Sequence, residues 1–308
     1  MKKTQLRTRL FCALCALSLS AATANAQLLF KISGDSLAKP SYVVGTLHTV
    51  SSTFAPQITG INEAINHTEQ VFGEMDIKEA RSAATTARIK EASMLPDGKT
   101  IKDVLTAEQL TKVNKLLRET MGTDFNNPKM LEQMGRLCPA ALSNSIVVVL
   151  YIMRHAGNYN PDALIDLYFQ QVAEANHEPT GGLETADEQI KILYGQPLER
   201  QTQMLMCLTE NSEAMSQSLE DAVEAYMRQD LEGVGKLLED QYGNGCDFTA
   251  EERDALIGNR NRDWAGKMTD IMAKNATLFV VGAGHLTGES NLLDLLRQKG
   301  YTVEAVTK

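Results

Sequence analysis

Two short apolar runs, one near each end of this 308-residue chain, finish in the same Gly-x-x-His pattern. Residues 41–48 read Ser-Tyr-Val-Val-Gly-Thr-Leu-His, and residues 277–285 read Thr-Leu-Phe-Val-Val-Gly-Ala-Gly-His. Short runs of valine, leucine, phenylalanine and tyrosine are typical of buried strands. We expect Gly45 and Gly282 to let the backbone turn sharply as it leaves the sheet. The histidine after each glycine would then lie at the carboxyl edge, where open α/β sheets bind their ligands.

Each run is followed by a helical segment and then by another strand, which predicts a β-α-β unit. Because the two units resemble each other, we expect an α/β fold whose mixed central sheet is built from two related halves. Residues 77–275 are mostly helical in pattern, with one short strand at residues 179–183 and capping boxes at Thr106 and Thr249. We therefore expect one domain, residues 27–308, with a large helical insertion. The predicted helices of the two units are residues 56–67 and 289–299, and their second strands are residues 70–75 and 301–306.

The first 26 residues have the composition of a signal peptide. A segment with four cations precedes an apolar run at residues 10–19 and an Ala-Asn-Ala sequence at residues 24–26. We expect cleavage after Ala26, a mature chain that starts at Gln27, and a periplasmic or secreted protein. No later apolar run approaches the ~20 residues that cross a bilayer, and residues 146–153 predict a buried helix instead.

Charge and cysteine content limit the partners and the covalent links. Removing the first 26 residues, with four cations and no anions, takes the formal charge from −9 to −13. Such an acidic chain is a poor ligand for nucleic acid or an anionic membrane surface. Three cysteines remain in the mature chain, and we favour a bridge between Cys207 and Cys246, which share one helical region, over a pairing with Cys138. The sequence leaves the oligomeric state open.

His48, His285 and Glu74 are the leading candidates for chemistry. Neutral imidazole is a common metal ligand and transfers protons near neutral pH, although a histidine after a strand often has only a structural role. Glu74 follows the apolar run Val-Phe-Gly. A buried carboxylate is costly unless it is paired or bound to a cation. The alternative is that the strand ends there and Glu74 is solvated.

Glu184 and Arg260 are further candidates, each with an ordinary structural explanation. Glu184 lies at a strand-to-helix junction, where the helix dipole alone favours a carboxylate. Arg260 lies within a predicted helix, on a cationic stripe that a solvated face would also explain. If Arg260 faces the cleft, its guanidinium could bind a carboxylate or a developing oxyanion.

Five blocks of the sequence are informative together: residues 42–48, residues 71–76, residues 165–169 leading to 182–185 and Gln189, residues 260–264, and residues 280–288 running on to 299–303. In this order and spacing they resemble the TraB/GumN family, which includes the TIKI Wnt-inactivating proteases. The resemblance implies a fold like that of erythromycin esterases and haem-binding ChaN proteins, and a metal-dependent peptidase activity. The family's two Gly-x-x-His motifs, glutamate and arginine would fall on His48, His285, Glu74 and Arg260.

The leading hypothesis is an exported metal-dependent hydrolase that acts on a peptide or protein substrate. His48, Glu74 and His285 would hold a divalent metal, Zn, Mn or Co, while Arg260 steadies the oxyanion. A second hypothesis is a non-catalytic periplasmic protein that binds haem or another ligand through one of these histidines. A third is a scaffold for export or polysaccharide assembly.

Overall fold

The computed structural model describes residues 27–34, 37–96, 98–155 and 159–307. The predicted signal peptide lies outside these residues. The centre of the fold is a six-stranded sheet with the order β4-β3-β5-β2-β1-β6. Its strands are β1 (Leu29–Ser33), β2 (Ser41–Thr46), β3 (Gln70–Gly73), β4 (Thr180–Gly182), β5 (Thr277–Gly282) and β6 (Thr302–Ala305).

The sheet is mixed, as predicted. Strands β4, β3, β5 and β2 are parallel to one another, and β1 is antiparallel to both β2 and β6. Thr46 of β2 pairs with Gly282 of β5, and Gly73 of β3 pairs with Gly182 of β4. The four parallel strands therefore end at one edge of the sheet.

Both Gly-x-x-His strands begin the expected β-α-β unit, but the two units differ in span. From β2, the chain passes through η1 (Ser52–Gln57) and α1 (Ile61–His67) to β3, which lies beyond β5. From β5, it passes through η5 (Ala283–Leu286) and α14 (Leu292–Gln298) to β6, which lies beyond both β2 and β1. The amino-terminal strand β1 thus occupies the place that a symmetric second unit would give to β6.

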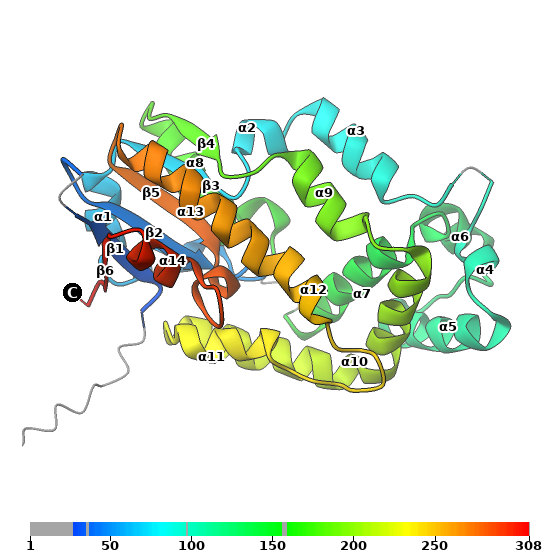
Figure 1. The fold of residues 1–308 in the computed structure, drawn as a ribbon. Coiled ribbons are helices and arrows are strands. Elements are labelled where there is room, and N and C mark those ends of the chain that lie inside the picture. Colours follow the sequence, from blue (N-terminus) through cyan, green and yellow to red (C-terminus); the bar gives the residue numbers. More distant parts are fainter. Residues whose placement is uncertain (1–26, 35–36, 97, 156–158, 308) are drawn as a thin grey trace, which may run out of the picture.

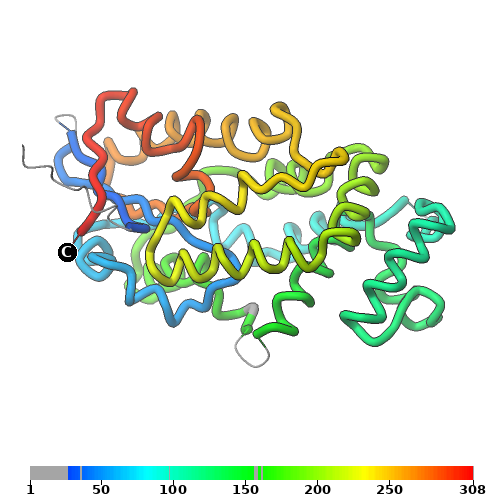
Figure 2. Tube along the Cα trace, turned by 90° about the horizontal axis from the view of Figure 1, so that it is seen from below, coloured from blue at the N-terminus to red at the C-terminus, as the bar shows by residue number. Residues whose placement is uncertain are grey.

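Helices cover both faces of the sheet. Figures 1 and 2 show α13 (Asn259–Met272) and α14 on one face, and α1 and α8 (Ile165–Ala175) on the other. The core between these layers contains Phe169, Trp264 and Phe279, each at most 1% exposed. Such burial of large apolar side chains is the main favourable term for folding.

Most of the rest of the chain forms a helical part beside the sheet, which appears at the right of Figure 1 and has an apolar cluster of its own, whereas Tyr226, Leu231 and Val234 pack into the core around the sheet. The predicted capping boxes at Thr106 and Thr249 are confirmed. The elements of this part and its connections are α2 (Ile77–Ala80), α3 (Ala83–Ala92), α4 (Ile101–Val104), α5 (Ala107–Met121), α6 (Pro128–Met134), α7 (Pro139–Arg154), η2 (Pro161–Ala163), α9 (Ala186–Tyr194), α10 (Leu198–Met227), α11 (Leu231–Gly235), η3 (Lys236–Leu238), α12 (Ala250–Arg253) and a π-helical turn η4 (Asp254–Gly258).

Residues 146–153 are helical, as predicted, but they are not fully buried. They belong to α7, which packs one face against α5 and α10, so the opposite face stays exposed at Val147, Val148, Ile152 and Met153. Among the described helices, none combines the length and the apolar character that a membrane span requires.

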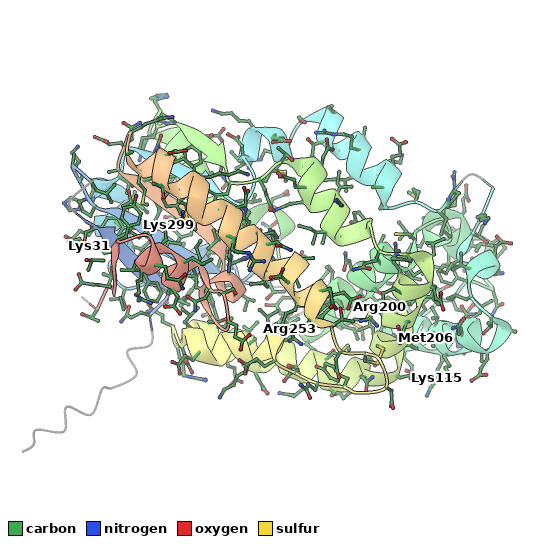
Figure 3. The ribbon with its side chains drawn as sticks, viewed as in Figure 1. Lys31, Lys115, Arg200, Met206, Arg253 and Lys299 are labelled. Carbon is green, nitrogen blue, oxygen red and sulfur yellow. A yellow bond between two sulfur atoms is a disulfide. The ribbon has the colours of Figure 1, made fainter. Side chains whose placement is uncertain are left out.

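The predicted disulfide between Cys207 and Cys246 is confirmed, and Cys138 is a buried free thiol. The bridge joins α10 to the segment that precedes α12. Arg200, labelled in Figure 3, reinforces the same junction by donating to the carbonyl oxygens of Gly245 and Asp247 at 2.6 and 2.8 Å.

Candidate functional site

Four of the residues singled out from the sequence follow the ends of four adjacent parallel strands. Glu184 follows β4, Glu74 follows β3, His285 follows β5 and His48 follows β2. Backbone pairing continues past β3 and β4, because the Glu184 amide donates to the Glu74 carbonyl at 2.8 Å. The carboxyl edge of parallel strands is where open α/β folds bind ligands.

Arg260 of α13 directs all five N–H groups of its guanidinium at acceptors within the chain. Nε and one Nη2 hydrogen reach the two carboxylate oxygens of Glu184, at 2.9 and 2.6 Å. The other Nη2 hydrogen reaches Glu74 Oε2 at 2.7 Å. The Nη1 hydrogens reach His285 Nε2 at 2.9 Å and the Leu256 carbonyl oxygen at 3.0 Å. Since a guanidinium has five donors, this arrangement leaves none for a substrate.

A local irregularity in the helix precedes Arg260. The π-helical turn η4 gives a backbone bond from the Asn259 amide to the Asp254 carbonyl, five residues back. Such turns often occur at functional sites. Here the Leu256 carbonyl accepts from the Arg260 side chain, which ties the guanidinium to its own helix.

His285 is held as a neutral imidazole with its proton on Nδ1. The Asn261 amide nitrogen donates to the carbonyl oxygens of His285 and Ser290, so Asn261 Oδ1 faces His285 Nδ1 at 2.7 Å and accepts its hydrogen. Nε2 then accepts from Arg260. Burial lowers the pKa of His285 to about 4, with the charges of Arg260 and His48 acting in the same direction against the opposing effect of Glu74.

Trp264, one turn after Arg260 on α13, forms an apolar wall for this group. Its ring lies 4.4 Å from the His285 ring, and the Arg260 guanidinium carbon lies 4.6 Å from its ring centroid. A cation over an indole face is attracted by the ring quadrupole. The indole therefore fixes both the imidazole and the guanidinium.

Glu74 is an ionised carboxylate with both oxygens engaged. Oε1 accepts from the Gly282 amide at 2.7 Å, and Oε2 accepts from Arg260. Burial by itself would raise the pKa of Glu74, but His285, Arg260, His48 and the Gly282 amide together lower it. Glu74 lies just beyond the end of β3 and is paired, so the alternative of a solvated carboxylate is wrong.

His48 forms a separate pair with Asp166, the second residue of α8. His48 Nδ1 lies 3.0 Å from Asp166 Oδ2, and Thr46 donates to Asp166 Oδ1. The charge of Asp166 raises the pKa of His48 to about 9. Because 72% of the His48 side chain is exposed, solvent screens this pair more than the buried cluster of Arg260, Glu74, Glu184 and His285, which we call the Arg260 group. Charge from Glu74 and Arg260 also acts on His48, so the two groups are coupled electrostatically.

Asp166 was not among the residues singled out from the sequence. Its position in the third of the five blocks that carried the resemblance was the available signal. Burial raises the pKa of Asp166, but His48 and Thr46 outweigh that effect and lower it. Its Oδ2 atom is buried and makes no hydrogen bond of good geometry among the described residues.

The two motif glycines do not act as the sequence suggested. Gly45 lies inside β2 and is not a turn residue. A Cβ at Gly45 would lie 3.1 Å from Ala283 Cα, so the glycine allows the turn after β5 to approach β2 closely. Gly282 ends β5 with φ −56°, which any residue can adopt, and its amide binds Glu74. The expectation of a glycine-dependent sharp turn at these positions is therefore wrong.

The predicted ligand set of His48, Glu74 and His285 does not surround a common point in this arrangement. Among the described residues, no three His, Cys, Asp or Glu side chains are placed to hold a metal ion. Arg260 occupies the lone pair of His285 Nε2 and one oxygen of Glu74. A tetrahedral zinc site takes three or four protein ligands. The residues as arranged therefore do not fit the ion.

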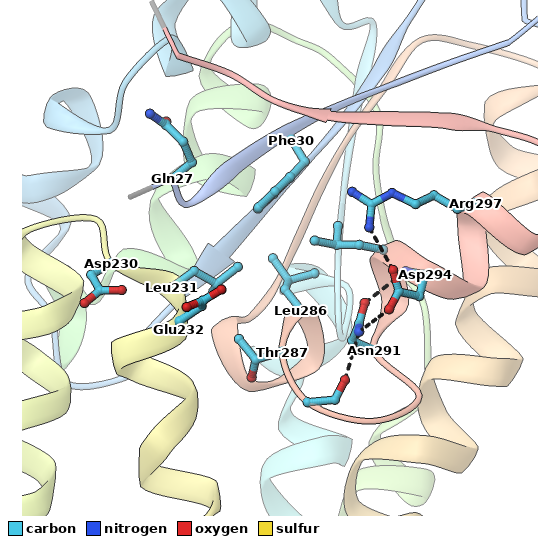
Figure 4. A pocket seen from close by; sticks show the side chains of 12 residues that line it. Gln27, Phe30, Asp230, Leu231, Glu232, Leu286, Thr287, Asn291, Asp294 and Arg297 are labelled. Atoms are coloured by element: carbon cyan, nitrogen blue, oxygen red, sulfur yellow. Dashed lines mark hydrogen bonds and ion pairs between the residues drawn. The ribbon is translucent and has the colours of Figure 1, made fainter. Parts of the chain in front are cut away.

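A polar cavity lies beside η5, and its lining includes Leu286 and Thr287, which directly follow His285 in the sequence. It has a volume of about 390 Å³ and includes Gln27, Asp230 and Asp294 in its lining. Figure 4 shows Asp294 bound to Asn291 and Arg297, so its carboxylate is already paired. None of the candidate residues described above lines this cavity.

Comparison with known proteins identifies the chain's relatives. The model of the TraB/PrgY/gumN family matches residues 28–305, nearly the whole described chain. This chain belongs to that family. No solved structure matches it in the corresponding comparison.

The curated relatives are distant and longer than this chain. Metalloprotease TIKI2 of Xenopus tropicalis is 25% identical over 86% of this chain and 57% of its own length. Metalloprotease TIKI1 of Homo sapiens is 26% identical over 86% of this chain and 59% of its own length. The homologue from Nematostella vectensis is 20% identical over 87% of this chain and 65% of its own length. This family member thus spans less than two thirds of each of these relatives.

Proposed function

We propose that this chain is an exported hydrolase that cleaves peptide bonds in protein substrates at the carboxyl edge of its sheet. The observation that carries the proposal is that the exposed His48–Asp166 pair and the buried Arg260 group lie at the same edge of the sheet. The names of the curated relatives, which are metalloproteases, support it. The signal-peptide composition and the disulfide support export.

His48 is the residue of this site that a substrate can reach. Its side chain is 72% exposed, whereas those of Glu74, Glu184, Arg260 and His285 are at most 15% exposed. With its pKa raised to about 9, His48 carries a proton at neutral pH. As water adds to the scissile carbonyl and the C–N bond breaks, His48 can donate that proton to the leaving amine while Asp166 orients the ring. The proton that the attacking water loses restores the imidazolium. We assign His48 as the general acid and Asp166 as its positioning residue.

The buried group acts as a positioning unit in this proposal. Arg260 holds Glu74, Glu184 and His285 with all its donors, so the oxyanion role expected from the sequence has no free N–H to perform it. The group instead fixes the ends of β3, β4 and β5 relative to α13. A fixed set of charges beside the exposed His48 is the kind of preorganised environment that stabilises developing charge.

The names of the relatives imply a divalent ion, for which Zn, Mn and Co remain the candidates. Binding by His48, Glu74 and His285 requires Arg260 to release His285 Nε2 and Glu74 Oε2. We assign no step of the reaction to the ion. Metal analysis of the purified protein, beside His48→Ala and His285→Ala, tests whether these side chains hold one.

The activity test compares His48→Ala with His67→Ala on an unfolded protein substrate. Loss of a general acid costs on the order of 10²–10⁴-fold in rate, so His48→Ala should lose most of its activity and His67→Ala none. Both side chains are on the surface, so both variants should stay folded in thermal melts, although His48→Ala also loses the stabilising pair with Asp166. Equal cleavage by both variants would remove the support for this site.

The alternative of a haem-binding protein gains no support from the apolar cavity of about 800 Å³ beside Arg260 and Trp264. The described residues that line it include no histidine to serve as an axial ligand. A Soret band in the purified protein would revive this alternative.

A further inference from the structure

A large, mainly apolar cavity reaches the buried Arg260 group. It has a volume of about 800 Å³, and Glu184, Arg260 and Trp264 are among the residues that line it. Its walls come from α7, α9, α10 and the helical segment α12–η4–α13. Figure 1 shows α7, α9 and α12 between the sheet at the left and helices α4, α5 and α6 at the right. Concave apolar sites of 300–1,000 Å³ with a few convergent polar groups are typical ligand sites.

Most polar side chains in the cavity wall already have partners. Arg200 donates to Glu252 at 2.7 Å through both Nε and Nη2, in addition to its bonds with the neighbouring loop. Gln201 donates to two carbonyl oxygens at 2.8 and 3.0 Å, and Asp263 pairs with Lys267 at 2.7 Å. The wall contains four acidic and three basic side chains, so it has little net charge with which to select a charged ligand.

Apolar side chains at the rim are left uncovered. Val147, Leu193 and Phe248 are 38%, 47% and 41% exposed, and all three line this cavity. They come from α7, α9 and the segment before α12. Among the described residues, eight large apolar side chains are exposed, and these three of them come from three different walls of one cavity. Exposed apolar groups gathered in this way mark binding sites.

The wall that carries Phe248 is fixed in place. The Cys207–Cys246 disulfide ties the preceding segment to α10, and Arg200 binds the carbonyl oxygens of Gly245 and Asp247. The position of this wall is therefore fixed by covalent and charge-assisted contacts. A preformed site avoids the ordering cost of assembling one on binding.

We propose that this cavity binds apolar side chains of the polypeptide substrate on one side of the bond that is cleaved. This assignment rests on the proposed function and names its substrate class: extended segments with leucine- or phenylalanine-like residues. Because Glu184, Arg260 and Trp264 line the cavity, such a segment lies beside the reacting edge. The volume accommodates several side chains, and the paired polar wall offers little to a charged one.

The test uses the full mature protein and a set of fluorescence-quenched peptides that differ at one position at a time. We expect kcat/KM to be about tenfold or more higher for leucine or phenylalanine than for serine or aspartate at one or more positions on one side of the cut, as is usual for apolar pockets. Leu193→Gln and Phe248→Gln should reduce this preference several-fold, mainly through KM. Met227→Gln is the matched control, because Met227 is 47% exposed and lies outside the cavity lining.

A binding measurement separates this inference from the proposed function. In His48→Ala, fluorescence anisotropy should show a labelled apolar peptide binding more tightly than its serine-substituted counterpart, and combining His48→Ala with Leu193→Gln or Phe248→Gln should remove the difference. If wild type cleaves nothing but this binding pattern appears, the peptidase assignment falls and the cavity assignment stands. Cleavage without apolar preference, or pocket variants that behave like Met227→Gln, overturns the cavity assignment alone. Binding of a fluorescent fatty acid without any peptide binding also overturns it.

Discussion

Arg260 carries its charge in a site from which most water is excluded, since its side chain is only 12% exposed. Burial lowers the pKa of an arginine, but Glu184 and Glu74 outweigh that effect and raise the pKa of Arg260. The two carboxylates are needed together, because one alone would leave donors of a buried cation unpaired. An unpaired buried charge is among the costliest defects in a folded protein.

Glu184→Gln should therefore lower the free energy of unfolding by about 2 kcal/mol, because a charged hydrogen-bond acceptor becomes a neutral one at a buried site. Urea denaturation of the purified variant measures this. Glu132→Gln, at an exposed position of α6, is the matched control and should stay within about 0.5 kcal/mol of wild type. A Glu184→Gln variant as stable as the control would show that the bidentate contact contributes little.

The two motif histidines should titrate at opposite ends of the pH range. Burial and nearby cations lower the pKa of His285 to about 4, and Asp166 raises that of His48 to about 9, from an ordinary value of 6.5. NMR titration of the imidazole signals should show His285 neutral at pH 6 and His48 protonated at pH 8. Asp166→Asn should move the His48 midpoint toward 6.5. A titration midpoint of His285 near pH 6.5 would contradict a buried, neutral imidazole at this position.

The same shifts give the pH dependence of stability. Between pH 6.5 and 4 the unfolded chain binds more protons at His285 than the folded chain, so the free energy of unfolding should fall as pH is lowered through this window. For His48 the sign is reversed, and its contribution is lost as pH rises from 6.5 to about 9. Because His48 is exposed and screened by solvent, urea denaturation should show a larger loss of stability between pH 6.5 and 4, from His285, than between pH 6.5 and 9, from His48.

The individual residues of the site could be found from sequence, but not the contacts between them. Glu74, Glu184, Arg260 and His285 were each recognisable from local pattern. Their bonds join residues 76 and 186 positions apart, which no local pattern reports. Of the two roles considered for Arg260, binding a carboxylate agrees with its contacts to Glu74 and Glu184. Local sequence cannot tell whether a donor also stays free for an oxyanion, since a free guanidinium and one with five internal acceptors have the same sequence signature.

At the scale of elements, the strands were predictable because their apolar runs are short and bounded by turn residues. The roles of glycines within them were not, because those depend on what lies across the sheet. A Cβ at Gly182 would lie 2.6 Å from the Asp76 amide nitrogen, and one at Gly181 would lie 2.4 Å from the Phe72 ring. These glycines let β4 lie close against β3 and the chain that follows it.

Gly182→Ala should accordingly destabilise the protein by about 1–3 kcal/mol, the usual cost of overpacking, because backbone atoms at Asp76 cannot move aside cheaply. It should also reduce cleavage by shifting Glu184 relative to Glu74. Gly266→Ala on α13 is the matched control, because a Cβ there meets no atom within 4 Å. That variant should gain about 0.5–1 kcal/mol, as alanine favours a helix. Equal melting of the two variants would contradict the close-packing argument.

At the scale of the whole molecule, the prediction of an α/β fold with a helical middle is confirmed, and the strand order is what local sequence could not supply. Two similar β-α-β units are compatible with several orders. The chain places β1 between β2 and β6, so the units are related in sequence pattern but not equivalent in the sheet. Pairing across more than 200 residues, as between β2 and β5, decides this arrangement.

The Cys207–Cys246 bridge joins α10 to the segment before α12, and α12 continues through η4 into α13, the helix that carries Arg260. A disulfide that closes a loop of 39 residues is expected to stabilise the folded protein by about 4 kcal/mol through chain entropy.

The Cys207→Ala/Cys246→Ala variant should lose most of that free energy of unfolding in urea denaturation, and reductant should lower the denaturation midpoint of wild type but not of the double variant. Cys138→Ala removes the remaining thiol without touching the bridge and should stay within about 1 kcal/mol of wild type. If reductant shifts neither the midpoint nor cleavage of the apolar peptides, the bridge does not hold the Arg260 segment against α10.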